Sequence, residues 1–282
     1  MKKPFVFALL MLGTLIGAML WALQTKEAKP VVGTGTVIQP AINHVSAIDP
    51  TLVPFKGMTL LEWLATMNMD EGNIPEGMRE AVSFYGSNAV PVLLEMAGHS
   101  DSSVKKQLLD LQRRHTFVRL GLVRAYENRW RATSVMQFVR PHARLAVPEL
   151  IRLLTHEDPE VRRDAAGGLL MLEEGAEAAV PALVRRLKDG DAQVRAKAAA
   201  ALGRIGKHPQ LAVPALIAAI SDPNEKVRAN ASGHLAAFGA DAKPAVPHLL
   251  KALTDVAPAV RVRARNALNV IAPDAEEAPP SK

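Results

Sequence analysis

The sequence predicts an all-α protein: a right-handed α-solenoid of stacked helix pairs, preceded by one N-terminal transmembrane helix. Three observations carry this prediction: a tripeptide that recurs every 33 residues, a second motif at a fixed distance from it, and an uncharged apolar run near the N-terminus. Of the 282 residues, 49% are hydrophobic but only 4% are aromatic. An apolar content of mainly Ala, Leu and Val suits close packing of helices better than the core of a sheet.

The tripeptide Ala-Val-Pro marks the start of each repeat. Its copies are Ala89–Pro91, Ala146–Pro148, Ala179–Pro181, Ala212–Pro214 and Ala245–Pro247, and the last four are 33 residues apart. Fourteen positions after each Val of the tripeptide comes a second Val, and a basic residue follows it. These pairs are Val104-Lys105, Val161-Arg162, Val194-Arg195, Val227-Arg228 and Val260-Arg261. Self-similarity at such a period is typical of a solenoid.

Each repeat is expected to hold two helices separated by a short polar break. The Pro falls in the first turn of the first helix, where its missing N–H would have no partner. Asp191 stands at the N-cap of one second helix, and Gly206 follows that helix where a C-terminus favours glycine. Its apolar residues share one face, namely Val194, Ala198, Leu202 and Ile205. Since one pair cannot bury this face alone, the pairs are expected to stack.

These motifs resemble the HEAT-repeat superfamily, in particular the short repeats of the phycobilisome-lyase HEAT-like type, over residues 86–272 and weakly over 57–85. In that family an Asp six residues before the Arg contributes to a ladder of ion pairs between neighbouring repeats. The resemblance implies a structural ladder of Asp189, Arg195, Asp222, Arg228, Asp255 and Arg261. His99 and His156 replace the Asp in the two earlier repeats, so the ladder is expected to be broken there.

The first repeat departs from the regular spacing. Val90 and Val147 are 57 residues apart, which is 24 more than the period, and a long or doubled helix is expected in between. This basic insertion, 105–144, holds ten basic residues against two acidic ones. Such a run is either an anion-binding surface or, as we favour, the solvated face of a helix. On the first interpretation, Arg113, Arg114 and Arg124 are candidate partner-binding residues.

Residues 1–23 are interpreted as a membrane anchor or signal segment. Pro4 to Leu23 carries no charge and has about the length that spans a bilayer, and Lys2 and Lys3 precede it. We favour an uncleaved signal-anchor, with the rest of the chain outside the cytoplasm, on the periplasmic side if the cell is Gram-negative. The alternative is a signal peptide and a secreted protein. Residues 24–57 are expected to be a flexible linker, 58–85 a degenerate capping repeat, 86–272 the solenoid and 273–282 a disordered tail.

The candidate binding surface is the inner face of the solenoid, lined by the second helices. In register, Asp164, Lys197, Asn230 and Arg263 each fall three residues past the second Val, and His234 lies one turn further along its helix. Of these, Lys197, Asn230, His234 and Arg263 are the predicted partner-binding residues. No catalytic, cofactor-binding or metal-binding residue is expected: the chain has no Cys, and His156-Glu157 is a lone pair where a metal site needs several converging ligands.

The preferred function is a membrane-tethered, non-enzymatic scaffold that binds a protein or peptide through the inner face, because solenoids present extended surfaces rather than catalytic pockets. Two alternatives stay open, namely an enzyme or enzyme subunit of the HEAT-like lyase or hydroxylase kind, and a purely structural spacer in the cell envelope. Nucleic acid is disfavoured as a partner because an export signal would take the chain away from it.

Overall fold

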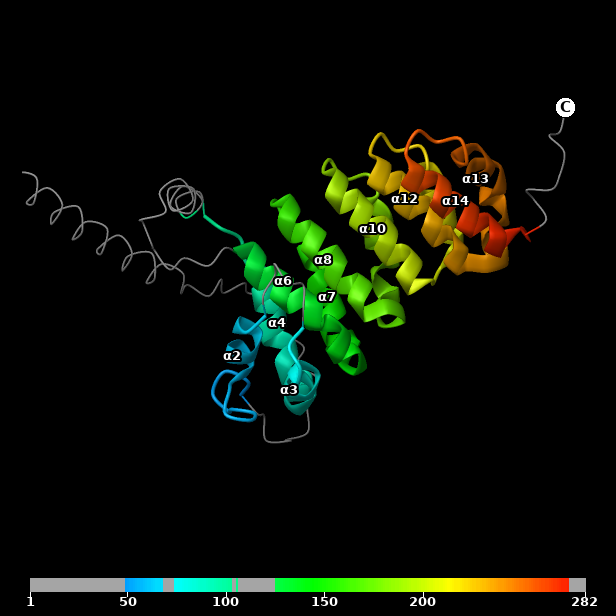
Figure 1. Ribbon diagram of the computed structural model, residues 1–282. Helices are drawn as coiled ribbons and strands as arrows, with labels where there is room; N and C mark the ends of the chain where they lie inside the picture. Colours follow the sequence, from blue (N-terminus) through cyan, green and yellow to red (C-terminus); the bar gives the residue numbers. More distant parts are fainter. Residues whose placement is uncertain (1–48, 68–73, 103–104, 106–124, 274–282) are drawn as a thin grey trace, which may run out of the picture. The chain divides into compact units, whose positions relative to one another are not determined.

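The computed structural model describes residues 49–67, 74–102, 105 and 125–273 (Figure 1). Their regular structure is α-helix and 3-10 helix, with one isolated bridge between Phe55 and Met58. None of the helices in this part of the chain is long and apolar enough to cross a membrane. The anchor expected at 1–23, most of the linker and nearly all of the tail lie outside the described residues.

The segment expected to be a capping repeat holds α2 (Leu60–Ala65) and α3 (Met78–Tyr85). Thr59 begins α2 with a capping box, in which Glu62 accepts from the backbone N–H of Thr59 at 2.7 Å. The last residues of the expected linker are fixed to these helices. Tyr85 donates its hydroxyl to the carbonyl of Val53 at 2.8 Å, and the Trp63 ring N–H donates to that of Phe55 at 3.0 Å. Two carbonyls at the end of the expected linker thus serve the packing of α2 and α3, since buried Tyr and Trp polar groups need acceptors.

Beyond α3, helix pairs stack in chain order. The second helices α6, α8, α10, α12 and α14 lie next to one another in one row, and each contacts the next (Figure 1). The first helices α4, α7, α9, α11 and α13 form the other layer, and a 3-10 segment precedes each of them except α11. The elements are η1 (Gly86–Asn88), α4 (Ala89–Ala97), α6 (Ala125–Val135), η2 (Met136–His142), α7 (Ala143–Leu153), α8 (Pro159–Leu172), η3 (Glu173–Ala179), α9 (Val180–Arg186), α10 (Ala192–Ile205), α11 (Pro209–Ala219), α12 (Glu225–His234), η4 (Leu235–Ala245), α13 (Val246–Ala252) and α14 (Pro258–Ile271). This arrangement is an α-solenoid; its right-handed sense stays a prediction.

The repeated motifs occupy equivalent places in this stack. The Pro of each Ala-Val-Pro faces solvent, whereas the second Val of each regular repeat is fully buried. Four residues after that Val, each regular repeat has a fully buried Ala, namely Ala165, Ala198, Ala231 and Ala264. Small side chains there let neighbouring second helices approach closely. Asp191 caps α10 by accepting from the N–H groups of Gln193 and Val194, at 2.8 and 3.0 Å.

The 24 excess residues of the first repeat lie between its two helices. The Asp101 carboxylate accepts from the N–H of Ala125 at 3.0 Å, and Arg129 donates to the carbonyl of His99 at 2.7 Å. Arg162 makes the same bond to His156, at 2.8 Å, without an insertion. Arg129 therefore holds the place that the spacing assigned to Lys105, and α6 is the second helix that contacts α8. Residues 125–144 belong to the repeats, while Arg113, Arg114 and Arg124 lie outside the described residues.

Removing residues 102–125 is expected to leave a folded protein whose free energy of unfolding changes by less than about 1 kcal/mol, because loop length enters closure entropy only logarithmically. The deletion joins Asp101 to Tyr126 and places His99 six residues before Arg129, the spacing of His156 and Arg162. Urea unfolding followed by circular dichroism measures the change.

A deletion of 101–124 is a matched control, because it has the same length but leaves Ala125 where Asp101 would cap the helix. It is expected to be about 1 kcal/mol less stable than the first deletion. Equal stability of the two deletions would contradict the capping role of Asp101, and unfolding of both would show that the repeats need the removed segment.

Candidate functional site: a groove along the second helices

A ladder of ion pairs joins neighbouring repeats beside the N-termini of the second helices. The guanidinium of each Arg binds both carboxylate oxygens of the Asp one repeat later. The Nε and Nη2 contacts measure 2.8 and 2.7 Å for Arg162–Asp189, 2.8 and 3.0 Å for Arg195–Asp222, and 2.7 and 2.8 Å for Arg228–Asp255. Nη1 donates to a carbonyl six residues earlier, such as that of Asp222 for Arg228 at 3.0 Å. Each Arg therefore binds its own repeat and the next one.

The ladder carboxylates are held in the ionised form. Burial alone would raise the pKa of Asp222, but the hydrogen bonds from Arg195 and from the N–H of Asn224 outweigh it, and the pKa lies below its ordinary value. The bond from Arg228 likewise lowers the pKa of Asp255. Arg261 donates to the carbonyls of Asp255 and Val256, at 2.7 and 3.1 Å, and meets no carboxylate among the described residues. The ladder side chains therefore have their hydrogen-bond and ion-pair partners within the protein.

At His156 the ladder takes a different form, as the substitution of Asp by His implied. His156 accepts from the N–H of Asp158 at 3.0 Å and offers Arg129 no carboxylate. Arg129, only 1% exposed, binds Asp164 at 2.7 Å and Glu160 at 2.5 Å instead. The spacing did not single out Arg129 as a site residue, although it stands 33 residues before Arg162 and could have been found by that signal.

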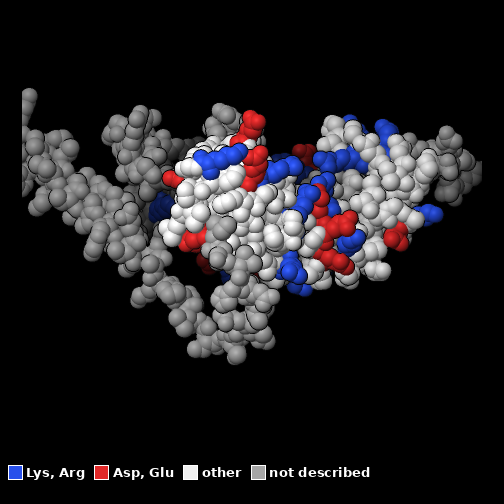
Figure 2. Space-filling model, turned by 90° about the horizontal axis from the view of Figure 1, so that it is seen from below, with Lys and Arg blue, Asp and Glu red and all other residues white. Residues whose placement is uncertain are grey.

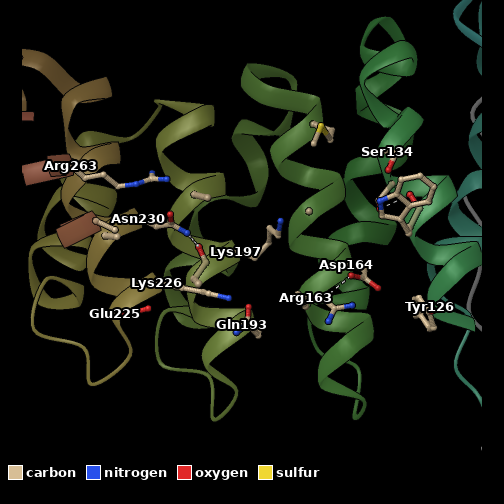
Figure 3. Close-up of a pocket in the computed structure, with 18 residues that line it drawn as sticks. Tyr126, Ser134, Arg163, Asp164, Gln193, Lys197, Glu225, Lys226, Asn230 and Arg263 are labelled. Atoms are coloured by element: carbon tan, nitrogen blue, oxygen red, sulfur yellow. Dashed lines mark hydrogen bonds and ion pairs between the residues drawn. The ribbon is translucent and has the colours of Figure 1, made fainter. Parts of the chain in front are cut away.

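A groove of about 610 Å³ runs along the second helices from α6 to α14 (Figure 3). All of the residues in the predicted inner-face row line it, namely Asp164, Lys197, Asn230 and Arg263. Its lining at the α6–α8 end includes Tyr126, Trp130, Thr133, Ser134, Arg163, Gly167 and Met171, and further along Gln193, Ala196, Ala200, Glu225, Lys226, Ala229 and Ala259. The register prediction therefore identified one row of a wider surface.

The polar residues of the groove differ in whether their side chains already have hydrogen-bond or ion-pair partners within the protein. Asp164 is taken up by Arg129 and by Arg163, the latter at 2.9 Å. The Asn230 amide donates to the carbonyl of Ala196 at 2.9 Å, which leaves its side-chain oxygen available. Lys197 and Arg263 have no hydrogen-bond or ion-pair partner within the described ranges. Figure 3 shows Lys197, Asn230 and Arg263 on successive helices along one face of the groove.

Two glycines support the stems of the free cations. A Cβ built on Gly167 would lie 3.9 Å from Cδ of Lys197, and one on Gly233 would lie 3.3 Å from Cβ and Cδ of Arg263. Both side chains therefore extend over the helix of the preceding repeat, Arg263 in close contact with Gly233 and Lys197 with more room above Gly167. The charged heads reach the groove while the apolar stems stay packed.

The predicted partner-binding role of His234 is not supported by its position, because His234 does not line the groove. The missing side chain of Gly203 lets it pack closely against α10: a Cβ on Gly203 would lie 2.2 Å from Cβ of His234. Burial, and then the charges of Arg263 and Arg204, lower the pKa of His234 to about 4. Its imidazole is therefore neutral at pH 7 and belongs to the packing between repeats.

Acid is expected to destabilise the protein through His234. The unfolded chain takes up a proton near pH 6.5 and the folded chain only near pH 4, so the free energy of unfolding falls as the pH drops through that window. We expect a loss of about 2–3 kcal/mol between pH 7.5 and pH 4.5 from this residue. Urea unfolding of the wild type and of His234→Gln measures it; an equally steep pH dependence in the variant would contradict the assignment.

Charge is mixed over the face of the described residues seen in Figure 2, where Lys and Arg alternate with Asp and Glu rather than gathering in a patch of one sign. Within the ranges described, no group of three or more His, Asp or Glu side chains is arranged to hold a metal ion. The feature that distinguishes the groove is its set of free cations.

Stacked helix pairs, an Arg–Asp ladder between them and a groove along one layer define an α-helical repeat solenoid. The model of the HEAT repeats family matches residues 121–202 and 180–269, which together span more than half of the chain. This chain belongs to the HEAT repeat family. No curated protein matches it in sequence.

Several solved structures are similar to the chain. A designed armadillo repeat protein in complex with the peptide (KR)4 is 16% identical, with 75% of this chain and 98% of that chain covered and a TM-score of 0.46. An engineered protein from a structural genomics consortium is 21% identical, with 75% and 57% covered and a TM-score of 0.48. A further match, to computationally designed armadillo repeat proteins for modular peptide recognition, is 19% identical with 75% and 98% covered and a TM-score of 0.43.

Proposed function

We propose that this HEAT-repeat protein is a non-enzymatic binding module that takes up a segment of another protein in the groove from α6 to α14. The observation that carries the proposal is that its polar side chains fall into two groups, one paired within the protein and one unpaired in the groove. Those that join the repeats are paired within the ladder, whereas Lys197 and Arg263 are held in place in the groove without a partner among the described residues. A solenoid offers such a surface over several repeats at once.

Affinity capture from the native cell, with the full-length protein as bait, tests this function. Lys197→Glu with Arg263→Glu is expected to lose the captured partner, because both charges are reversed inside the groove. Lys243→Glu with Lys251→Glu makes the same change in net charge at exposed positions in η4 and α13, outside the groove lining, and is expected to retain the partner. Equal capture by both variants would remove the groove as the binding site, and absence of any partner would favour a structural spacer.

We further propose that residues 1–23 tether this module to a membrane, with the repeats outside the cytoplasm. The support is the uncharged run from Pro4 to Leu23 behind Lys2 and Lys3. Cell fractionation and protease digestion of intact spheroplasts test it: the full-length protein is expected in the membrane fraction and open to external protease. Recovery in the cytoplasm would reject the tether, and recovery in the medium as a shortened chain would favour a cleaved signal peptide.

A further inference from the structure

We infer that the occupant of the groove is an acidic protein segment in extended form, with its carboxylates against α10–α14 and a large apolar side chain against α6–α8. This inference rests on the proposed function and gives its partner a chemical class. It follows from the residual charge of the groove, the positioning of its cations and the different character of its two ends.

The charges of the groove do not cancel at the α10–α14 end. Arg163 and Asp164 form an ion pair at 2.9 Å, so the two neutralise each other near α8. What remains is Lys197, Lys226 and Arg263 against the single carboxylate of Glu225, and none of the three cations has a hydrogen-bond or ion-pair partner among the described residues. An acidic ligand would supply the missing partners.

The cations are positioned before any ligand arrives. The stem of Lys197 lies over Gly167, and that of Arg263 over Gly233. Packing of a long stem reduces the rotamer freedom that binding would otherwise remove, so a carboxylate meets groups that are already placed. Burial is the main cause of the low pKa of the neighbouring His234, and the positive charge of Arg263 lowers that pKa further. A bound carboxylate would supply Arg263 with a partner of opposite charge.

The α6–α8 end of the groove has a different chemistry. Tyr126 and Trp130 from α6 and Met171 from α8 stand there, and Gly167 and Ala200 leave room beside them. Trp130 and Met171 pack against the core on one side and line the groove on the other. Aromatic and Met side chains around a recess of this kind favour a large apolar group.

The distance between the two ends sets the length of the segment. Packed helices lie about 8–10 Å apart, so the four steps from α6 to α14 span about 32–40 Å. At about 3.3 Å per residue, an extended segment of about 10–12 residues covers that span.

A single-stranded nucleic acid is the competing occupant, and the charge distribution disfavours it. A phosphate backbone carries negative charge along its whole length and needs cations throughout the groove. Among the described residues, the one groove cation at the α6–α8 end is Arg163, which is already paired with Asp164, and Glu225 would repel a phosphate at the other end.

Selection from a phage-displayed library of random 12-residue peptides on the full-length protein tests the inference. Enriched peptides are expected to carry two or more Asp or Glu residues in one half and an aromatic or long aliphatic residue in the other. Their affinity, measured by fluorescence anisotropy with synthetic labelled peptides, is expected to fall at least tenfold in Lys197→Glu/Arg263→Glu and to stay unchanged in Lys243→Glu/Lys251→Glu. Exchange of the peptide's acidic residues for Lys is expected to cause a similar loss, and added salt to weaken binding.

The outcomes separate the inference from the proposed function. Enrichment of basic or neutral peptides whose binding is lost in Trp130→Ala would reject an acidic partner and keep the groove as a binding site. Tighter binding of a twelve-nucleotide oligo-dT than of any enriched peptide would also reject it. No enrichment at all, together with no captured cellular partner, would reject both. Thermal unfolding of each variant shows that lost binding is not lost folding.

Discussion

Replacement of Arg129 by Ala is expected to lower the free energy of unfolding by about 3–5 kcal/mol, the largest effect of any single substitution proposed for this protein. Arg129 is 1% exposed, and its Nε, Nη1 and Nη2 atoms bind Asp164, His99 and Glu160 at 2.7, 2.7 and 2.5 Å. Its loss leaves the largely buried Asp164 with Arg163 alone and opens a cavity between α6 and α8. Urea unfolding of the purified variant measures the change.

Two further variants show whether the three bonds of Arg129 cause the loss. Arg129→Lys keeps the charge but cannot reach three acceptors in different directions, so it is expected to recover only part of the stability. Arg152→Ala removes an ion pair with Glu149 in which the Arg side chain is 66% exposed, and is expected to cost less than about 1 kcal/mol. A similar small cost for Arg129→Ala would contradict a structural role for this buried guanidinium.

Replacement of Gly203 by Ala is expected to destabilise the protein by about 2–3 kcal/mol. The added Cβ would lie 2.2 Å from Cβ and 2.6 Å from Cγ of His234, so α10 and α12 would have to separate. The better helix propensity of Ala, about 1 kcal/mol, offsets only part of this cost. Thermal and urea unfolding measure the difference.

Gly167→Ala is the matched control, since Gly167 also lies inside a second helix but its nearest neighbour would be 3.9 Å away. It is expected to be neutral or to stabilise by up to about 1 kcal/mol. In the double variant Gly203→Ala/His234→Gly the contacting atom is gone, so the two substitutions are expected to be strongly coupled. Additive effects would show that contact with His234 is not the cause.

The sequence was informative wherever a feature recurs in every repeat. The second Val and the following Arg could be located because stacking demands the same contact at each step, and the row with Lys197, Asn230 and Arg263 follows from the same register. Features that occur once were harder to place. Val104-Lys105 satisfied the local spacing as well as Asn128-Arg129 does, and only the contacts of Arg129 with His99 and Asp164 decide between them.

The position of His234 shows a second limit. Register alone directs its side chain toward the inner face, but the depth that it reaches depends on the absent side chain of Gly203 in the preceding repeat. Asp164 likewise shares a row with Lys197, yet its carboxylate forms an ion pair with the buried guanidinium of Arg129. Both outcomes depend on pairs of residues in different repeats, which the period of one sequence does not reveal.

The Arg–Asp ladder also fixes the spacing of the side chains along the groove. Each ladder Arg stands two positions before the groove residue of the row Asp164, Lys197, Asn230 and Arg263, as Arg195 does before Lys197. A bidentate rung that fixes one repeat against the next therefore also fixes the interval between successive groove side chains. Partners would be discriminated by the spacing of their side chains as well as by their charge, and a weakened rung would relax selectivity before it abolished binding.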